Sequence, residues 1–290
     1  SYPTVELCHA VQEYADRHGI PTIMDIRDLW PDIFVGVLPS VVQSLAKLLL
    51  QPYLKQSRKT LANCTSIVAV SDGYLKWGLE RGSRTLSTHD RVFPLAYEGG
   101  GIGSQDDDEG PVTFLFVGTF GTTYSLEPVI RAARHQLEVN ASRAARFIFC
   151  GDGEKGEEWR AAAEGLTNVQ FTGWVDRDRL ASLLRKAHVG LAAYAPDAPQ
   201  GIPNKVIEYM SAGLPIVSSL GGETKRLLCE GNAGISYSDD VGLYAAINTL
   251  LDTDTRKRIA LGIYKIYKEQ FDARKVYAEY IDHIESVSGR

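Results

Sequence analysis

Short apolar runs alternate with amphipathic segments along most of this chain of 290 residues. Continuous runs rich in β-branched residues are typical of strands buried on both faces of a parallel sheet. The segments between them carry apolar residues three or four positions apart, as helices with one buried face do. The alternation therefore predicts an α/β protein built from β–α–β units. The nine predicted strands are residues 21–26, 66–70, 91–95, 112–117, 146–150, 169–172, 189–193, 214–218 and 234–237.

A glycine-rich and acidic segment at residues 98–111 interrupts this alternation and predicts a domain boundary, because it can bury almost no apolar surface. Three predicted strands precede it, which is few for a doubly wound domain, and five or six follow. The chain also begins at Ser1 without a methionine, so we expect a truncated first domain. The expected parts are a first domain at 1–98, a linker at 99–110, a second domain at 111–265 and a C-terminal helix at 266–290 that packs back on the first domain.

The most specific motif lies in residues 199–219. Gly201 allows backbone conformations that other residues disfavour, and Pro203 suits the first position of a helix, where its missing N–H costs nothing. The exposed start of this helix can bind anionic oxygens, and Lys205 adds a positive charge suited to a diphosphate. Glu208 lies one turn further on the same face, where it can accept hydrogen bonds from a ribose diol. The alternative is a surface ion pair between Lys205 and Glu208, which does not account for the surrounding glycines and prolines.

The turn after residues 112–117 is a second candidate. Gly118, Gly121 and Thr122 follow a buried strand and precede a helix expected to start near Ser125. Such a turn can present backbone N–H groups to a phosphate. The alternative is a tight turn without a ligand, because two glycines three residues apart are common.

Residues 203–218 resemble the donor-site signature of retaining glycosyltransferases with the GT-B fold, glycosyltransferase family 4. Segments 117–118, 150–153, 169–175 and 191–194 follow in the order and spacing of that family. Upstream, residues 20–31 contain the motif Asp-Leu-Trp-Pro and are similar to the bacterial amino-sugar, capsule and lipopolysaccharide branch of that family. The resemblance covers nearly the whole chain. It implies two Rossmann-like domains with parallel sheets, the N-terminal one lacking about a hundred residues.

The resemblance also implies roles for individual residues. Glu208 would hold the donor ribose, and Lys205 with the turn at Gly118, Gly121 and Thr122 would hold the diphosphate. Backbone groups of Gly173, Trp174 and Val175 would meet the edge of the base. Catalytic positions would be Arg27, Asp28 and Gln200, and the diphosphate or sugar would also meet Gly201, Ile202, Pro203 and Asn204.

The sequence departs from the family at two places. Gln200 stands eight residues before Glu208, where the family has a glutamate facing the donor sugar, so the charge is lost and the hydrogen-bonding capacity kept. The basic residues that many members carry after the Val-Gly strand are absent, and Thr119, Phe120 and Tyr124 stand nearby.

Arg27 and Asp28 occupy the place of a His-Asp pair that faces the cleft in the family, where they would contact the acceptor or the donor sugar. The alternative for these two is a structural ion pair beneath Trp30.

From this resemblance we expect a retaining transferase that uses neither a metal nor another cofactor. It would move a sugar, a hexosamine, from a UDP-sugar to a glycan or polyprenyl-linked acceptor in bacterial cell-surface polysaccharide synthesis. The alternatives are a catalytically silent partner protein that binds a nucleotide sugar, which the two departures favour, and a nucleotide-sugar epimerase of the same fold. The epimerase would need a clear set of cleft carboxylates or histidines, and the sequence shows none.

Charge and motif counts exclude several other classes. There are 31 Lys and Arg residues against 36 Asp and Glu, a net charge of -5, so no basic field favours a nucleic acid. The six histidines form no metal-binding motif, and no Gly-x-Ser-x-Gly elbow occurs. The acidic runs at 106–108 and 176–178 favour solvated charge and an N-cap at Asp176 over a metal site. The four cysteines, which form no Cys-x-x-Cys pair, are expected to be reduced and buried in a cytosolic protein.

Residues 41–61 suggest a contact with a membrane surface. Apolar residues gather on one side of this stretch, and basic residues follow. Such a helix can rest on an anionic membrane at the inner face of the plasma membrane, although no apolar run is long enough to span one. The alternative is an ordinary domain helix with a solvated basic edge. The apolar residues are Val42, Leu45, Leu49 and Tyr53, and the basic ones are Lys47, Lys55, Arg58 and Lys59.

Overall fold

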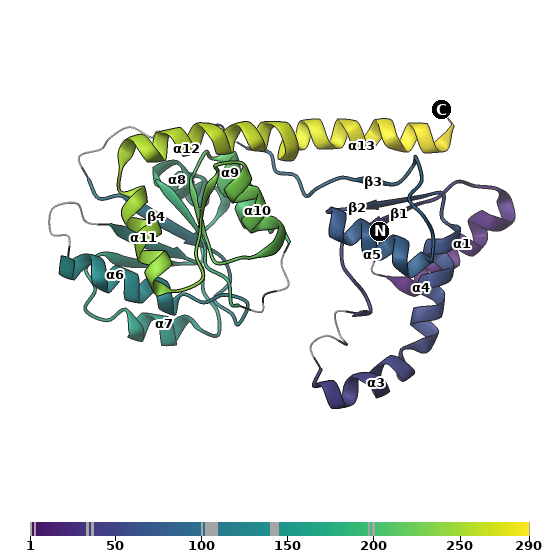
Figure 1. The fold of residues 1–290 in the computed structure, drawn as a ribbon, viewed down its shortest axis with the longest axis horizontal. Helices are drawn as coiled ribbons and strands as arrows, with labels where there is room; N and C mark the ends of the chain where they lie inside the picture. Colours follow the sequence, from purple (N-terminus) through teal and green to yellow (C-terminus); the bar gives the residue numbers. More distant parts are fainter. Residues whose placement is uncertain are drawn as a thin grey trace. The chain divides into compact units, whose positions relative to one another are not determined.

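The structure is a computed structural model that describes residues 2, 4–32, 35, 38–99, 101, 110–139, 145–196, 198 and 201–289. It divides into two compact units. Unit 1 holds Ser1–Leu95 and Arg274–Arg290, and unit 2 holds Ala96–Ala273. Each unit is built of helices around a parallel sheet (Figure 1).

Unit 1 has a three-stranded parallel sheet in the order β1-β2-β3. Its core is formed by apolar residues from the sheet and from the helices α1, α4 and α5. Gly78 of α5 allows a close approach, because a Cβ there would lie 2.4 Å from the Ile26 side chain of β1. The elements are β1 Ile23–Ile26, β2 Ser66–Ala69, β3 Arg91–Val92, α1 Val5–His18, α3 Ser40–Leu49, α4 Gln51–Asn63, α5 Asp72–Gly82 and α13 Ala273–Ser288.

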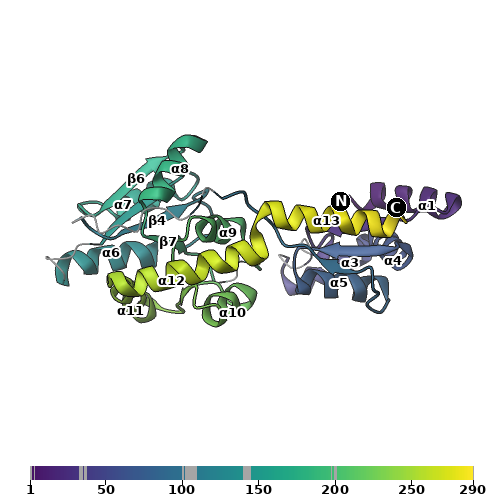
Figure 2. The same cartoon turned by 90° about the horizontal axis from the view of Figure 1, so that it is seen from above.

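The C-terminal helix α13 belongs to unit 1 and packs beside β3 of its sheet (Figure 1 and Figure 2). The rings of Phe93 and Tyr280 stack with their centroids 4.6 Å apart. The His283 side chain of the same helix is hydrogen-bonded to Ser66 of β2 at 3.0 Å. An aromatic stack and a buried polar contact therefore hold the last helix on this unit.

Unit 2 has a six-stranded parallel sheet in the order β6-β5-β4-β7-β8-β9. This is the strand order of a doubly wound sheet. The chain adds strands in one direction from β4 to β6 and in the opposite direction from β7 to β9, so the order reverses between β4 and β7. Phenylalanines from β4 and β5 fill the core, with Trp159 of α7 packed among them. The strands are β4 Thr113–Val117, β5 Arg146–Cys150, β6 Val169–Gly173, β7 Val189–Ala192, β8 Ile216–Ser218 and β9 Gly234–Ser236.

Helices cover both faces of this sheet, with α6, α7 and α11 on one side and α8, α9 and α12 on the other (Figure 1). Aspartates start three of them, because the side chains of Asp176, Asp239 and Asp252 accept hydrogen bonds from backbone amides in the first turn. The helices are α6 Glu127–Val139, α7 Gly156–Ala162, α8 Arg177–Lys186, α9 Asn204–Ser211, α10 Gly222–Glu230, α11 Asp240–Leu250, α12 Thr253–Ile266 and the π-helical segment η1 Tyr267–Phe271.

The prediction of an α/β fold with parallel sheets is confirmed, and each of the nine predicted ranges overlaps a strand. The N-cap at Asp176 is also confirmed, whereas the predicted C-terminal helix starts at Ala273 rather than at residue 266, because the π-helical segment η1 precedes it. The expectation of four buried cysteines is wrong at one position. Cys8, Cys64 and Cys150 are buried, whereas Cys229 is exposed on α10; all four are free.

The two units divide at other residues than the composition predicts. The connections between them lie at 95/96 and 273/274 rather than at 98 and 265. Hydrogen bonds explain the shift, since the Tyr97 amide donates to the Phe271 carbonyl and the Gly99 amide donates to the Tyr267 hydroxyl. These bonds join residues 97–99 to η1, which packs on α9 and α12 of unit 2. Most of the predicted linker lies outside the described residues.

Candidate donor site

The candidate site lies where β4 and β7 run side by side in the sheet of unit 2. The chain leaves these two strands toward opposite sides of the sheet, and ligands of such folds bind in the crevice at the carboxyl ends of the strands. The segments that follow β4 and β7 approach each other there, since Tyr124 and Tyr194 form an isolated antiparallel bridge. The helix α9, which carries Lys205 and Glu208, packs on β7.

Tyr209 fixes α9 beneath this crevice. Its ring is fully buried, its hydroxyl accepts from the Val117 amide at 2.9 Å, and it donates to the Leu191 carbonyl at 3.4 Å. Gly190 of β7 makes room for the ring, because a Cβ there would lie 2.4 Å from it. One buried tyrosine therefore ties the helix to both strands of the switch point.

Lys205 is buried, in contrast to the prediction of a lysine on an exposed first turn. Only 8% of the residue is accessible, and its Nζ lies 3.6 Å from the ring centroid of Phe116 and 3.8 Å from that of Tyr124. A third ring, Tyr194, lies at 5.4 Å. Nζ also lies against Gly118, where a Cβ would come within 2.8 Å of it. The aromatic rings come from the two strand ends, so the sheet order creates this environment.

The Lys205 ammonium has no hydrogen-bond partner among the described residues. Burial lowers the pKa of this group well below its usual value, and Glu208 opposes the shift. A buried cation without a partner is costly, and an anion beside it would restore the charged form. The position therefore suits an anionic group at the carboxyl end of β4.

Glu208 is half-buried one helical turn beyond Lys205. Its Oε1 accepts a hydrogen bond of 2.9 Å from the Tyr97 hydroxyl. Burial raises the pKa of Glu208, and the hydrogen bond from Tyr97 and the charge of Lys205 oppose this shift. No ion pair joins Lys205 to Glu208 among the described side chains, so the alternative of a simple surface pair is wrong.

Tyr97 is a site residue that the sequence reasoning missed. Burial and the neighbouring carboxylate raise its pKa to about 12, so the hydroxyl remains a donor. Its backbone is held by Phe271 and Ala273, whose positions in the chain are far from Tyr97. The available signal was its position two residues after the last predicted strand of the first domain, next to the expected domain boundary.

The turn after β4 uses much of its own hydrogen-bonding capacity. The Gly118 amide donates to the Cys150 carbonyl at 2.9 Å, and the Gly121 amide donates to the Thr119 carbonyl at 2.9 Å. These two predicted phosphate donors are therefore engaged within the protein. Of the three predicted residues, Thr122 is the one whose amide has no partner in the described part of the chain, so this amide can still donate to a phosphate.

The predicted base contacts lie at the end of β6. Gly173 has a positive φ of 68°, which favours glycine, and its carbonyl accepts from the Gly151 amide at 3.0 Å and from Thr172. Trp174 is exposed and Val175 is half-buried. The carbonyl of Gly173 is thus engaged, and the backbone groups of Trp174 and Val175 remain as candidates to contact the edge of a base.

The segment before α9 is fixed by α10. The Thr224 hydroxyl donates to the Gly201 carbonyl, and a Cβ on Gly201 would come 2.8 Å from a Glu223 carboxylate oxygen. Pro203 is the N-cap of α9 rather than its first residue, which is Asn204, because its ψ of 153° is extended. Ile202 is half-buried and Asn204 is exposed. The predicted catalytic residue Gln200 lies outside the described residues.

Arg27 and Asp28 lie in unit 1, just after β1. The Arg27 Nε donates to both carboxylate oxygens of Asp25, at 2.9 and 3.0 Å. The predicted alternative of an ion pair between Arg27 and Asp28 is therefore wrong, because Asp25 at the end of the strand takes the guanidinium. Asp28 is exposed, and Trp30 is partly exposed.

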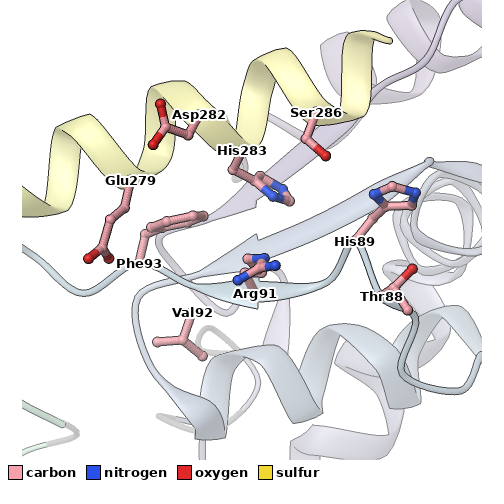
Figure 3. Close-up of a pocket in the computed structure, with 9 residues that line it drawn as sticks. All are labelled: Thr88, His89, Arg91, Val92, Phe93, Glu279, Asp282, His283 and Ser286. Carbon is pink, nitrogen blue, oxygen red and sulfur yellow. The ribbon is translucent and has the colours of Figure 1, made fainter. Parts of the chain in front are cut away.

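Two hollows are lined by residues other than Lys205 and Glu208. One in unit 1 has a volume of about 410 Å³, and Figure 3 shows His89 and Arg91 on one side of it and Asp282 and His283 of α13 on the other. One in unit 2 has a volume of about 440 Å³ and is lined by Tyr97, Arg177 and Arg185 among others. Across the described side chains, no group of three or more His, Cys, Asp and Glu residues is arranged to hold a metal ion.

The sequence of unit 2 matches a known protein family. The family described as "Glycosyl transferases group 1" matches residues 111–253. The phosphatidyl-myo-inositol mannosyltransferase of Mycolicibacterium smegmatis is 27% identical over 227 residues, which are 77% of this chain and 57% of that protein. The chain thus spans little more than half of this relative.

Solved structures share the fold at low identity. Anabaena HepE in complex with UDP gives a TM-score of 0.73 at 15% identity, covering 98% of this chain and 77% of that one. WaaG, described as a glycosyltransferase involved in lipopolysaccharide biosynthesis, gives 0.64 at 16% identity, covering 100% of this chain and 85% of that one. The family match identifies a glycosyltransferase group 1 domain in residues 111–253, and together with the doubly wound sheet of unit 2 these structures show that the chain has the GT-B fold.

Proposed function

We propose that this chain binds a UDP-sugar in unit 2 and belongs to a retaining glycosyltransferase that requires no metal. The observation that carries the proposal is the Lys205 ammonium, buried without a partner beside Gly118 and one helical turn from Glu208. A diphosphate supplies the missing anion, and a ribose diol suits the carboxylate. The UDP complexes of HepE, a structural neighbour of this chain, support uracil as the base.

The chemistry asked of these groups is positioning and charge stabilisation. When the sugar–phosphate bond breaks, negative charge grows on the departing diphosphate, and Lys205 with the Thr122 amide would stabilise it. The acceptor hydroxyl would attack the anomeric carbon from the side of the leaving group and give its proton to a leaving phosphate oxygen. The new glycosidic bond then has the original configuration, and UDP carries the proton away.

The sugar and the acceptor are the finer part of the proposal. The resemblance of residues 20–31 to the amino-sugar branch favours a hexosamine. A glycan or polyprenyl-linked acceptor in bacterial surface polysaccharide synthesis, at the inner face of the plasma membrane, agrees with the described role of WaaG and with the lipid named in the mycobacterial relative. In this account Arg27 and Asp28 contact the acceptor or the sugar, and Gln200 faces the sugar.

Calorimetric titration with UDP, GDP and ADP tests the donor site. We expect UDP to bind more tightly than GDP and ADP, and Glu208→Ala to weaken UDP binding by about 1–3 kcal/mol, the cost of losing a charged acceptor. Glu157→Ala, which removes an exposed carboxylate of α7, is the matched control and should leave binding unchanged. Chelation of metals with EDTA should also leave the affinity unchanged.

The same titration separates the alternatives. Equal, weak binding of all three nucleotides, or no effect of Glu208→Ala, would refute the donor site. UDP binding without transfer or donor hydrolysis by the full-length protein would favour the silent partner, which the loss of charge at Gln200 and the absence of basic residues in the turn after β4 motivate.

A further inference from the structure

Helix α3 of unit 1 exposes an unusual amount of apolar surface. Val41, Leu45, Leu48 and Leu49 are 86%, 58%, 66% and 72% exposed. Their spacing places them on one side of the helix, where Val42 joins them. Figure 1 shows α3 at the edge of its unit, away from the sheet. Five apolar side chains side by side on one helix form a patch that marks an interaction site rather than ordinary surface.

The charge around this patch is of one sign. Between Asp32 and Asp72 the sequence holds four basic residues and no acidic one, although the whole chain carries -5. Lys55 and Arg58 of the following helix α4 are exposed and have no ion-pair partner among the described residues, whereas Lys59 pairs with Glu13 at 2.8 Å. The segment that carries the apolar patch is therefore positively charged.

We propose that α3 is a membrane-surface helix that binds an anionic phospholipid bilayer. Its apolar side would enter the boundary between headgroups and acyl chains, and Lys55 and Arg58 would face the lipid phosphates. None of the helices the structure describes has the length and apolarity to cross a bilayer, so the helix would lie in the interface. A second copy of this chain is a poorer occupant, because it would bring the same positive segment against this one.

This binding has a consequence for the proposed function. A polyprenyl-linked acceptor lies in the bilayer, and a membrane-bound α3 would hold unit 1 at the same surface. That consequence rests on the proposed function, whereas the binding of α3 to lipid does not. Vesicle binding without nucleotide and UDP binding without vesicles therefore test the two proposals separately.

Vesicle flotation tests the membrane proposal with the 290-residue chain. We expect it to float with vesicles of phosphatidylcholine and phosphatidylglycerol, to float much less with phosphatidylcholine alone, and to be released by salt. A variant with Val41→Ser, Leu45→Ser and Leu48→Ser should bind the anionic vesicles more than about tenfold more weakly. Lys55→Glu with Arg58→Glu should also weaken binding, through the charge alone.

The matched control removes exposed apolar residues elsewhere. Val241→Ser on α11 and Leu261→Ser on α12, which are 77% and 67% exposed, should leave flotation unchanged. All these side chains lie at the surface, so an unchanged melting temperature would verify that the variants fold. Undiminished flotation of the triple variant, equal binding to neutral vesicles, or a dimer of the wild-type chain that the triple variant loses would each overturn the proposal.

Discussion

Lys205 and Glu208 are each held in surroundings that disfavour their charged form. Burial lowers the pKa of the lysine and raises that of the glutamate, and the two side chains do not form an ion pair with each other. Proteins do not usually bury an ammonium group without a partner, as Lys205 is buried here, whereas Glu208 already accepts a hydrogen bond from Tyr97. A nucleoside diphosphate would supply phosphates for the ammonium and a ribose diol for the carboxylate.

Replacing Lys205 by methionine should separate the two contacts. The thioether chain can fill the space among Phe116, Tyr124 and Tyr194 without a charge, so the fold should persist. We expect UDP affinity to fall about 10- to 100-fold, as for the loss of a hydrogen bond to a charged group, and uridine affinity to stay the same. Calorimetry with both ligands measures this. An equal loss for uridine and UDP would place the diphosphate elsewhere.

Tyr97→Phe should change the pH dependence of UDP binding. The ribose contact needs the ionised form of Glu208, whose pKa is raised by burial, so affinity should fall as the pH falls through that pKa. The Tyr97 hydroxyl holds the pKa down, and without it the fall should begin at a higher pH. Affinity at alkaline pH should change little.

Titrations over a pH series measure this shift. Tyr277→Phe, which alters an exposed tyrosine of α13, is the control and should keep the wild-type profile. If Tyr97→Phe shows the wild-type profile as well, Tyr97 does not tune this carboxylate. The readout is the position of the pH profile, which a loss of stability alone would not move.

At the scale of the elements, the packing of α9 on β4 and β7 determines the geometry of the site. Gly190→Ala should disturb it, because the added Cβ would lie 2.4 Å from the rigid, buried ring of Tyr209. We expect the free energy of unfolding to fall by about 1–3 kcal/mol, as for overpacking of a core. Urea unfolding followed by circular dichroism measures it.

Gly221→Ala is the matched control for that substitution. Its φ of -83° suits alanine, and a Cβ there would meet no atom within 4 Å. Its unfolding free energy should change by less than about 0.5 kcal/mol. An equal loss of stability in both variants would mean that the contact with Tyr209 is not what makes Gly190 necessary.

The strands and the motif on α9 could be predicted from the sequence, because apolar runs and a Gly-Pro-Lys-Glu pattern are local signals. The surroundings of Lys205 could not. Its aromatic neighbours follow or belong to β4 and β7, which lie far apart in the sequence and become neighbours only through the strand order. For the same reason the pattern could not show that Asp25, rather than Asp28, pairs with Arg27.

At the scale of the whole molecule, the chain crosses between two units at 95/96 and 273/274. On the side of unit 2, Tyr97 and Asp272 form a parallel bridge, so the two crossing segments are paired there. Tyr97 also donates to Glu208, so a residue of this paired segment contacts the candidate donor site directly. Composition placed the boundary in the glycine-rich segment, because composition reports where little can be buried and not where tertiary contacts end.

Hydrogen exchange measured with and without UDP tests the central claim most directly, because it locates the nucleotide on the intact chain. The account predicts that UDP slows exchange in residues 118–124 and 201–208, the turn after β4 and the start of α9, and leaves residues 66–93 of unit 1 unchanged. Unchanged exchange in both of those segments, or protection confined to residues 177–185 beside the hollow lined by Arg177 and Arg185, would contradict it.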